Sequence, residues 1–276
     1  MGYFTSDTTV RPPAVAGLFY PDDAQALRST VERLLADAHP SVDLPAPPKA
    51  LIVPHAGYVY SGPVAAAAYS LLVPLRRRIE RVVLIGPSHR VYLRGIALPQ
   101  ALSFATPLGE VSVDSAGGHT LLKRGDVLAA DAPHELEHSL EVQLPFLQSV
   151  LDDFALLPLV VGSATPEYVA SVLRDVWGGP ETLILASSDL SHYLSYKTAQ
   201  ATDAATAKAI VNRDTHISHE QACGAIGING LMLVARELEL AVAEIARQNS
   251  GDTAGDKHRV VGYGAYALYE PARSVS

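Results

Sequence analysis

Histidines follow several short apolar runs that we expect to form buried strands. His55, His89 and His192 each come a few residues after such a run. Neutral imidazole is a common ligand for zinc, iron and copper, and metal sites are assembled from distant segments. The joint pattern therefore predicts a metal site, whereas each histidine taken alone is more typical of a loop residue bonded to the backbone.

Asp189 and His192 are close enough in sequence for one tight turn to bring a carboxylate and an imidazole together. A carboxylate beside a histidine favours the imidazolium form and fixes the tautomer, which suits the ring for proton transfer. The alternative interpretation is structural, because Ser188 or Asp189 can cap the turn that follows. We therefore treat Asp189 and His192 as candidate catalytic residues.

Cys223 is the single cysteine of the chain and stands near the start of a long apolar segment expected to be helical. A helix N-terminus lowers the pKa of a thiol, and a bound metal deprotonates it outright. His216 and His219 lie just before it, so a local group of histidine and cysteine ligands is a weaker second candidate. The structural alternative is a small buried hydrophobe, the usual role of a free cysteine.

His134 and His138 satisfy the HExxH spacing, in which two histidines on one helix bind zinc and the glutamate acts as a base. Pro133 stands immediately before the motif and Pro145 follows soon after, so we expect too little continuous helix for that arrangement. The preferred interpretation is a polar helix start whose His138 and Glu141 face the common pocket. A zinc peptidase is the less favoured alternative.

Apolar runs and amphipathic segments alternate along most of the chain. The expected buried strands are Ala50–Val53, Arg81–Ile85, Ala155–Val161, Thr182–Ala186 and Val260–Leu268. The expected helices are Ala24–Ala38, Gly62–Leu72, Ser139–Leu151, Pro166–Trp177, Lys197–Asn212 and Gln221–Ala246, and the section Gly95–Asp114 is expected to add edge strands. This alternation predicts an α/β fold: one three-layer α/β/α domain over residues 1–276, with its core at about 11–270 and a mostly parallel or mixed central sheet. Ligands bind such sheets beyond the carboxyl ends of the strands.

The composition excludes several classes of protein. Among 276 residues, 48% are hydrophobic and the formal net charge is -8, which argues against general disorder and against nucleic acid as a partner. One cysteine cannot form an intramolecular disulfide, so we expect a reducing, cytoplasmic location. The longest apolar tract, Pro63–Leu75, is interrupted by Pro74 and is too short to cross a bilayer, so no membrane association is expected.

Taken together, several of these segments resemble the Memo family, and in bacteria and archaea protein B of the AmmeMemoRadiSam system. The resemblance extends from about Arg11 to Glu270. The segments that carry it are Pro54-His55-Ala56-Gly57-Tyr58, Gly86-Pro87-Ser88-His89, Glu137-His138-Ser139-Leu140-Glu141 with Leu144-Pro145-Phe146, Ser187-Ser188-Asp189 with His192, and Cys223-Gly224. Membership implies a fold similar to that of class III extradiol dioxygenases, whose non-heme iron is held by two histidines and a carboxylate.

The resemblance also implies roles for the candidate residues. His55 and His89 correspond to the two imidazole ligands of a metal, and Cys223 takes the third ligand position. His192 corresponds to the acid/base histidine of the dioxygenases. Asp189 and His138 line the same cavity and complete the candidate catalytic set.

A thiolate in place of the carboxylate shifts the metal preference toward copper(I) or a more covalent iron site, so ring cleavage does not follow from the resemblance. The expected cofactor is iron or copper, with zinc as a substitute. The expected ligand is an unidentified small molecule or peptide. The system's name implies a functional link to an AMMECR-like protein and a radical SAM enzyme, without implying physical contact.

Three functions are consistent with the sequence. The first is a metal-dependent, dioxygenase-like or otherwise oxidoreductase-like enzyme. The second is a non-catalytic adaptor that binds metal or peptide. The third is the HExxH zinc peptidase, which would depend on His134 and tolerate the loss of Cys223.

Overall fold

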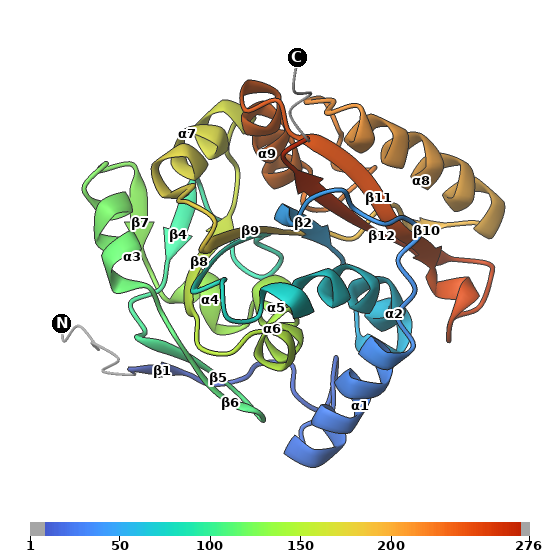
Figure 1. Ribbon diagram of the computed structural model, residues 1–276, viewed down its shortest axis with the longest axis horizontal. Helices are drawn as coiled ribbons and strands as arrows, with labels where there is room; N and C mark the ends of the chain where they lie inside the picture. The colour runs from blue at the N-terminus through green and yellow to red at the C-terminus, as the bar shows by residue number, and fades with distance from the viewer. Residues whose placement is uncertain (1–8, 272–276) are drawn as a thin grey trace.

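A nine-stranded mixed sheet runs through the centre of the protein in this computed structural model (Figure 1). The structure describes residues 9–271. Four neighbouring strands are parallel, in the order β2 (Pro48–Val53), β9 (Thr182–Ser187), β3 (Arg81–Pro87) and β8 (Ala155–Val161). The sheet continues beyond β2 with the antiparallel β12 (Val260–Tyr269), which also pairs with β11 (Ala241–Asn249) and β10 (His192–Leu194), and beyond β8 with β4 (Ile96–Leu98) and β7 (Val127–Ala129). A separate small sheet contains β1 (Val10–Arg11), β5 (Ser103–Thr106) and β6 (Gly109–Ser112).

The parallel strands are apolar on both faces, and this requires a layer of helices on each side. Side chains alternate along a strand, so Leu51 and Val53 of β2 enter one hydrophobic cluster while Ala50 and Ile52 enter the other. The other parallel strands repeat this division. The result is the α/β/α three-layer arrangement that the sequence predicts.

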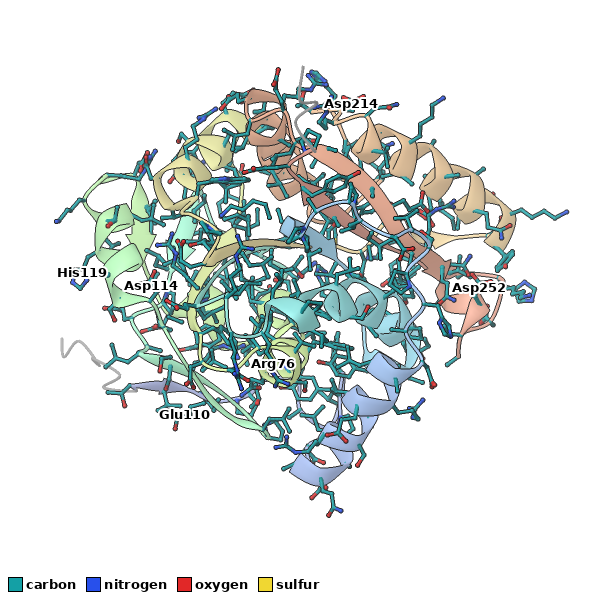
Figure 2. All side chains as sticks on the ribbon, viewed as in Figure 1. Arg76, Glu110, Asp114, His119, Asp214 and Asp252 are labelled. Carbon is teal, nitrogen blue, oxygen red and sulfur yellow. The ribbon has the colours of Figure 1, made fainter. Side chains whose placement is uncertain are left out.

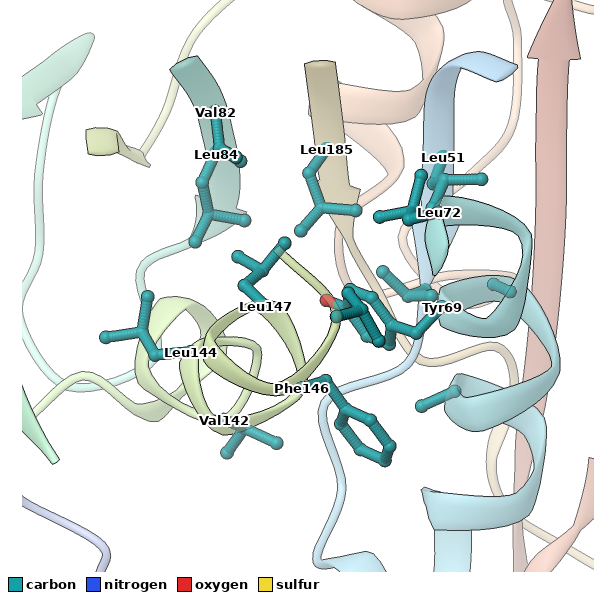
Figure 3. Packing of buried hydrophobic residues seen from close by; sticks show 14 of the residues in the cluster. Leu51, Tyr69, Leu72, Val82, Leu84, Val142, Leu144, Phe146, Leu147 and Leu185 are labelled. Atoms are coloured by element: carbon teal, nitrogen blue, oxygen red, sulfur yellow. The ribbon is translucent and has the colours of Figure 1, made fainter. Parts of the chain in front are cut away.

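One face of the sheet carries α1 (Ala24–Ala36), α2 (Tyr58–Tyr69), α5 (His138–Glu141) and α6 (Leu144–Val150), which lie together below the sheet in Figure 1. Figure 3 shows Leu147 of α6 facing Leu84 and Leu185 of the sheet. The rings of Tyr69 and Phe146 stack with centroids 4.9 Å apart and bind α2 to α6. The stretch Tyr58–Leu75 is apolar enough to resemble a membrane span, but 61% of it is buried here, as expected for a core helix.

The opposite face carries α3 (Ser115–Leu122), α7 (Pro166–Val176), α8 (Tyr196–Val211) and α9 (Ala225–Glu237). Helices α7 and α9 pack closely because Gly230 has no side chain: a Cβ there would lie 2.6 Å from Val169. The remaining short helices are η1 (Ser70–Leu75), α4 (Ala132–Glu135) and η2 (Ser250–Asp252).

The five predicted strands are confirmed, and the section Gly95–Asp114 does contain strands. Only β4 of these joins the central sheet, whereas β5 and β6 belong to the separate small sheet. The predicted helix Gln221–Ala246 is wrong in its second half, because α9 ends at Glu237 and the chain turns at Glu239, which has a φ of 54°. The following residues form β11, whose pairing with β12 overrides the helical preference of its alanines. The predicted helix Ser139–Leu151 is divided into α5 and α6, with Pro145 in the first turn of α6.

A buried ion pair fastens the N-terminal strand to the helices beneath the sheet. Arg11 Nη1 lies 2.7 Å from Glu141 Oε2, and the two side chains are 4% and 0% exposed. Glu141 also accepts hydrogen bonds from the amides of Ala14 and Val15 and from the hydroxyl of Tyr20. Four donors thus compensate one buried carboxylate, as a buried charge requires.

Replacing Arg11 with methionine leaves the Glu141 carboxylate buried without its cation, so we expect the free energy of unfolding to fall by about 3–5 kcal/mol. Urea denaturation measures this change. Arg76→Met is the matched control, because the ion pair between Arg76 and Asp152 is half exposed and should contribute less than about 1 kcal/mol (Figure 2 labels Arg76). Equal losses in the two variants would contradict the prediction.

Candidate metal centre

Three imidazoles converge beyond the carboxyl ends of the parallel strands. His55 follows β2, His89 follows β3, and His138 begins α5. One ring nitrogen of each lies within 4.8 Å of the others, and the ring centroids are 4.7 to 5.3 Å apart. Because β2, β9 and β3 are neighbouring parallel strands, His55 and His89 necessarily leave the sheet at one edge. This group could hold a metal ion.

The hydrogen bonds of Ser187 fix the tautomer of His55. The Ser187 hydroxyl donates its one proton to the Ser139 carbonyl at 2.6 Å, and it lies 2.8 Å from His55 Nδ1. The oxygen must therefore accept a proton from Nδ1, which leaves the lone pair of His55 on Nε2. The Ser187 hydroxyl also accepts a hydrogen bond from Gln143 Nε2, and Gln143 Oε1 in turn accepts one from the Tyr69 hydroxyl.

Glu137 joins the other two histidines. Its Oε1 lies 2.9 Å from His89 Nδ1 and 3.2 Å from His138 Nδ1, although the second contact is not a well-aligned hydrogen bond. The carboxylate also accepts from the amides of His89, His138 and Ser139. Burial acts to raise the pKa of Glu137, but the contacts with His138 and His89 outweigh it and hold that pKa well below its usual range. An ionised Glu137 can only accept, so Nδ1 of His89 carries the proton and Nε2 is free to bind a metal.

The surroundings of His55 favour its neutral form. His55 is buried, and burial together with the nearby rings of His138 and His89 holds its pKa well below the ordinary value. Three adjacent imidazolium ions would repel one another, whereas neutral imidazole is the form that binds metals. The arrangement is therefore suited to binding a metal cation.

Cys223 lies beside His55, with Sγ 3.3 Å from Nε2. The sulfur does not belong to the group of mutually close donors formed by His55, His89 and His138. Burial, and then the negative charge of Asp189, raise the pKa of the Cys223 thiol to about 12, in contrast to the lowering expected at a helix N-terminus. The neutral thiol donates to the free lone pair of His55.

Asp189 is buried directly after β9, and burial raises its pKa. Its Oδ1 accepts a hydrogen bond from the backbone amide of His55 at 2.8 Å, so this bond joins Asp189 to the loop of His55 and not to His192. His192 begins β10 and is half-buried; it, His138 and His89 act electrostatically on the Asp189 carboxylate. His138 is thus a member of the cluster, Asp189 is bonded to the loop of His55, and His192 is near enough to act electrostatically on both His55 and Asp189.

The HExxH arrangement is not formed. Helix α4 ends at Glu135, and the extended backbone of Glu137 separates it from α5, which begins at His138. His134 is buried elsewhere, with Nε2 3.1 Å from the Ala97 carbonyl. His216, from the weaker local group near Cys223, lies on the surface against Asp214. Only His138 of the two HExxH histidines reaches the cluster.

Sequence reasoning missed Ser187, Gln143 and Glu137 as residues that orient the cluster. Ser187 stands beside the candidate Asp189, and its position at a strand end was the one available signal. Glu137 directly precedes His138, but its reach to His89 depends on how α5 packs against β3. Gln143 carried no signal, because its partners are distant in the chain.

Replacing Glu137 with glutamine should weaken metal binding by roughly 10- to 100-fold, because the ionised acceptor that orients His89 and His138 is lost. Competition with a chelator, using zinc and cobalt(II), measures the change in Kd. Glu135→Gln is the matched control: it removes one negative charge from an exposed site two residues away. The role of Glu137 would be disproved by equal affinities in the two variants.

Replacing His134 with glutamine should reduce the loss of stability in acid. Burial lowers the pKa of His134 to about 4, so the folded protein keeps it neutral while the unfolded chain takes up a proton below about pH 6.5. Stability is therefore lost as the pH falls from about 6.5 toward 4, and the variant should lose about 1 kcal/mol less than the wild type between about pH 7.5 and about pH 5.5. Urea denaturation at both pH values tests this, with exposed His119 (Figure 2) changed to glutamine as the control.

The sequence is similar to known proteins over most of its length. The family model described as "Memo-like protein" matches residues 11–267. A MEMO1 family protein of Ignicoccus hospitalis is 38% identical over 93% of this chain and 97% of its own length, and one of Sulfolobus acidocaldarius is 36% identical over 92% and 97%. The crystal structure of an uncharacterized protein from Escherichia coli K12 aligns with a TM-score of 0.48 and 12% identity over 78% of this chain and 98% of that one. The chain belongs to the Memo family.

Proposed function

We propose that this protein is a metal-dependent, oxidoreductase-like enzyme that holds iron or copper on His55, His89 and Cys223, with His138 as a further imidazole donor. The observation that carries the proposal is the convergence of three histidines and one thiol, in which the partners of His55 and His89 leave the outward nitrogens free.

One pair of the proposed donors, His55 and Cys223, already has the spacing that a single ion requires. With bond lengths of about 2.0 Å to nitrogen and about 2.3 Å to sulfur, a tetrahedral ion separates its nitrogen and sulfur ligands by roughly 3.6 Å. The 3.3 Å between His55 Nε2 and Cys223 Sγ is close to that value. The thiol proton that now lies between the two atoms would have to leave.

The chemistry of the donors supports a borderline-soft transition metal. Imidazole suits iron, copper and zinc, and a thiolate adds preference for copper(I) or a covalent iron site. A hard cation such as magnesium prefers oxygen ligands and does not fit this set. Bound iron or copper would supply Lewis-acid and one-electron chemistry at this position.

His192 and Asp189 are suited to handling protons there. Asp189 is buried, and this burial raises the pKa of its carboxyl group. His192 is half-buried at the start of β10, so it can exchange protons between the cluster and solvent. We assign His192 the role of general acid/base and Asp189 the role of holding the His55 loop, through its bond to the amide of His55.

Metal content after anaerobic purification tests the proposal. His55→Ala should lose nearly all bound iron or copper, whereas His134→Ala should keep wild-type amounts, because His134 is bonded to Ala97 away from the cluster. Cobalt(II) then reports the ligands: sulfur coordination adds charge-transfer absorption that should disappear in Cys223→Ser and persist in His138→Ala.

Loss of metal in His134→Ala with retention in His55→Ala would overturn the proposed site. Wild-type protein that binds metal but shows no reversible one-electron change of the bound ion would favour a metal-binding adaptor over an enzyme. If the charge-transfer absorption persists in both Cys223→Ser and His138→Ala, Cys223 is not a ligand of the metal.

A further inference from the structure

A cavity of about 370 Å³ lies next to the candidate metal centre, on its Cys223 side. It opens among the carboxyl ends of β3, β8 and β9 and the first turn of α9. Its lining includes Ser187, which is bonded to His55, and Cys223, whose sulfur contacts His55. The cavity therefore ends against the sulfur side of the cluster, at the edge of the sheet where α/β proteins bind ligands.

The deep part of the cavity is formed by buried side chains and the outer part by exposed ones. Ile85, Ala186, Ser187 and Cys223 are buried at its inner end, whereas Tyr92 is 78% exposed at its mouth. A ligand entering from solvent would reach the sulfur last. The cavity thus has the orientation that a substrate pocket of this site requires.

The walls are fixed by backbone hydrogen bonds. The amide of Ser163 donates to the Leu93 carbonyl at 2.8 Å, and the amide of Ser88 donates to the Val161 carbonyl at 2.9 Å. The Ser88 hydroxyl donates a hydrogen bond to the Val91 carbonyl. These bonds tie the loop after β3 to the end of β8, so the cavity is preformed.

The lining determines what chemistry can occupy it. Within the described chain, none of the lining residues is Asp, Glu, Lys or Arg, and the one imidazole, His219, is exposed at the edge. The hydroxyls of Ser88 and Ser187 already donate to backbone carbonyls. A buried phosphate or carboxylate would therefore find no lysine or arginine side chain in this lining to neutralise its charge, and burying an unneutralised charge costs free energy.

We infer that this cavity binds the uncharged, mainly apolar part of the substrate and directs its reacting end toward Cys223 and His55. The inference rests on the proposed function for its orientation, since it assigns a substrate class to that same site. Its apolar walls, chiefly Val91, Leu93, Val161 and Ile226, supply the binding energy by desolvation. Its volume is at the lower end of the range of about 300–1,000 Å³ that small-molecule sites occupy.

The test uses two fluorinated probes of similar shape, neutral 4-fluorotoluene and anionic 4-fluorobenzoate, followed by fluorine NMR titration of the full chain. Wild-type protein should bind 4-fluorotoluene and show at least tenfold weaker binding of 4-fluorobenzoate. Ile226→Trp fills the cavity and should weaken 4-fluorotoluene binding at least tenfold. Leu233→Trp makes a similar change on the same helix, at a residue outside the lining, and should leave binding unchanged.

Binding of 4-fluorobenzoate as tight as that of 4-fluorotoluene, or no weakening in Ile226→Trp, would overturn the inference. Val91→Trp, at a partly exposed wall position, replaces Ile226→Trp if that variant does not fold. Metal content is measured on the same samples. Protein that takes up metal but not 4-fluorotoluene refutes the cavity assignment alone, and protein that binds 4-fluorotoluene but no metal refutes the proposed metal function alone.

Discussion

The buried pair of Arg11 and Glu141 controls the position of the segment on which the candidate site depends. The chain between α4 and α5 has no long helix to hold it in place. Arg11 supplies that support, because its guanidinium donates to the carbonyls of His134 and Glu137 as well as to Glu141. The positions of Glu137 and His138 therefore follow from a contact made by the first strand. A buried ion pair is costly to desolvate, and here it fixes a geometry that secondary structure alone does not.

Hydrogen-bond acceptors next to the cluster then orient the ring nitrogens of the histidines. Ser187 and Glu137 act as acceptors toward Nδ1 of His55 and His89, and acceptors on one nitrogen leave the lone pair on the other. Glu137 places its carboxylate beside both His89 and His138. The protein thereby brings three imidazoles together in a group that could hold a metal ion. The adjacent uncharged cavity adds a low-polarity side to the same region.

The sequence predicted the parts of the site that depend on strand ends and not those that depend on packing. His55 and His89 could be located because parallel strands share an edge, and the three-layer fold followed from runs that are apolar on both faces. His138 was expected in the pocket but not as a third member of the imidazole group, since its approach depends on a turn between two short helices. Glu137 and Gln143 could not be identified, because their partners are brought together only by tertiary structure. The alanine-rich β11 was mistaken for helix for the same reason: its conformation is imposed by β12.

The pKa of the Cys223 thiol depends more on its tertiary surroundings than on its position next to a helix. A position just before a helix should favour the thiolate, yet removal from water and the proximity of Asp189 outweigh this effect and keep the proton on sulfur. Sulfur would thus bind a metal only when the free energy of the metal–sulfur bond exceeds the free energy needed to remove the thiol proton. A soft metal ion forms a strong bond to thiolate and can displace the thiol proton, but a hard metal ion cannot. With Cys223 in the proposed ligand set, the free energy of its deprotonation would favour soft metal ions over hard ones.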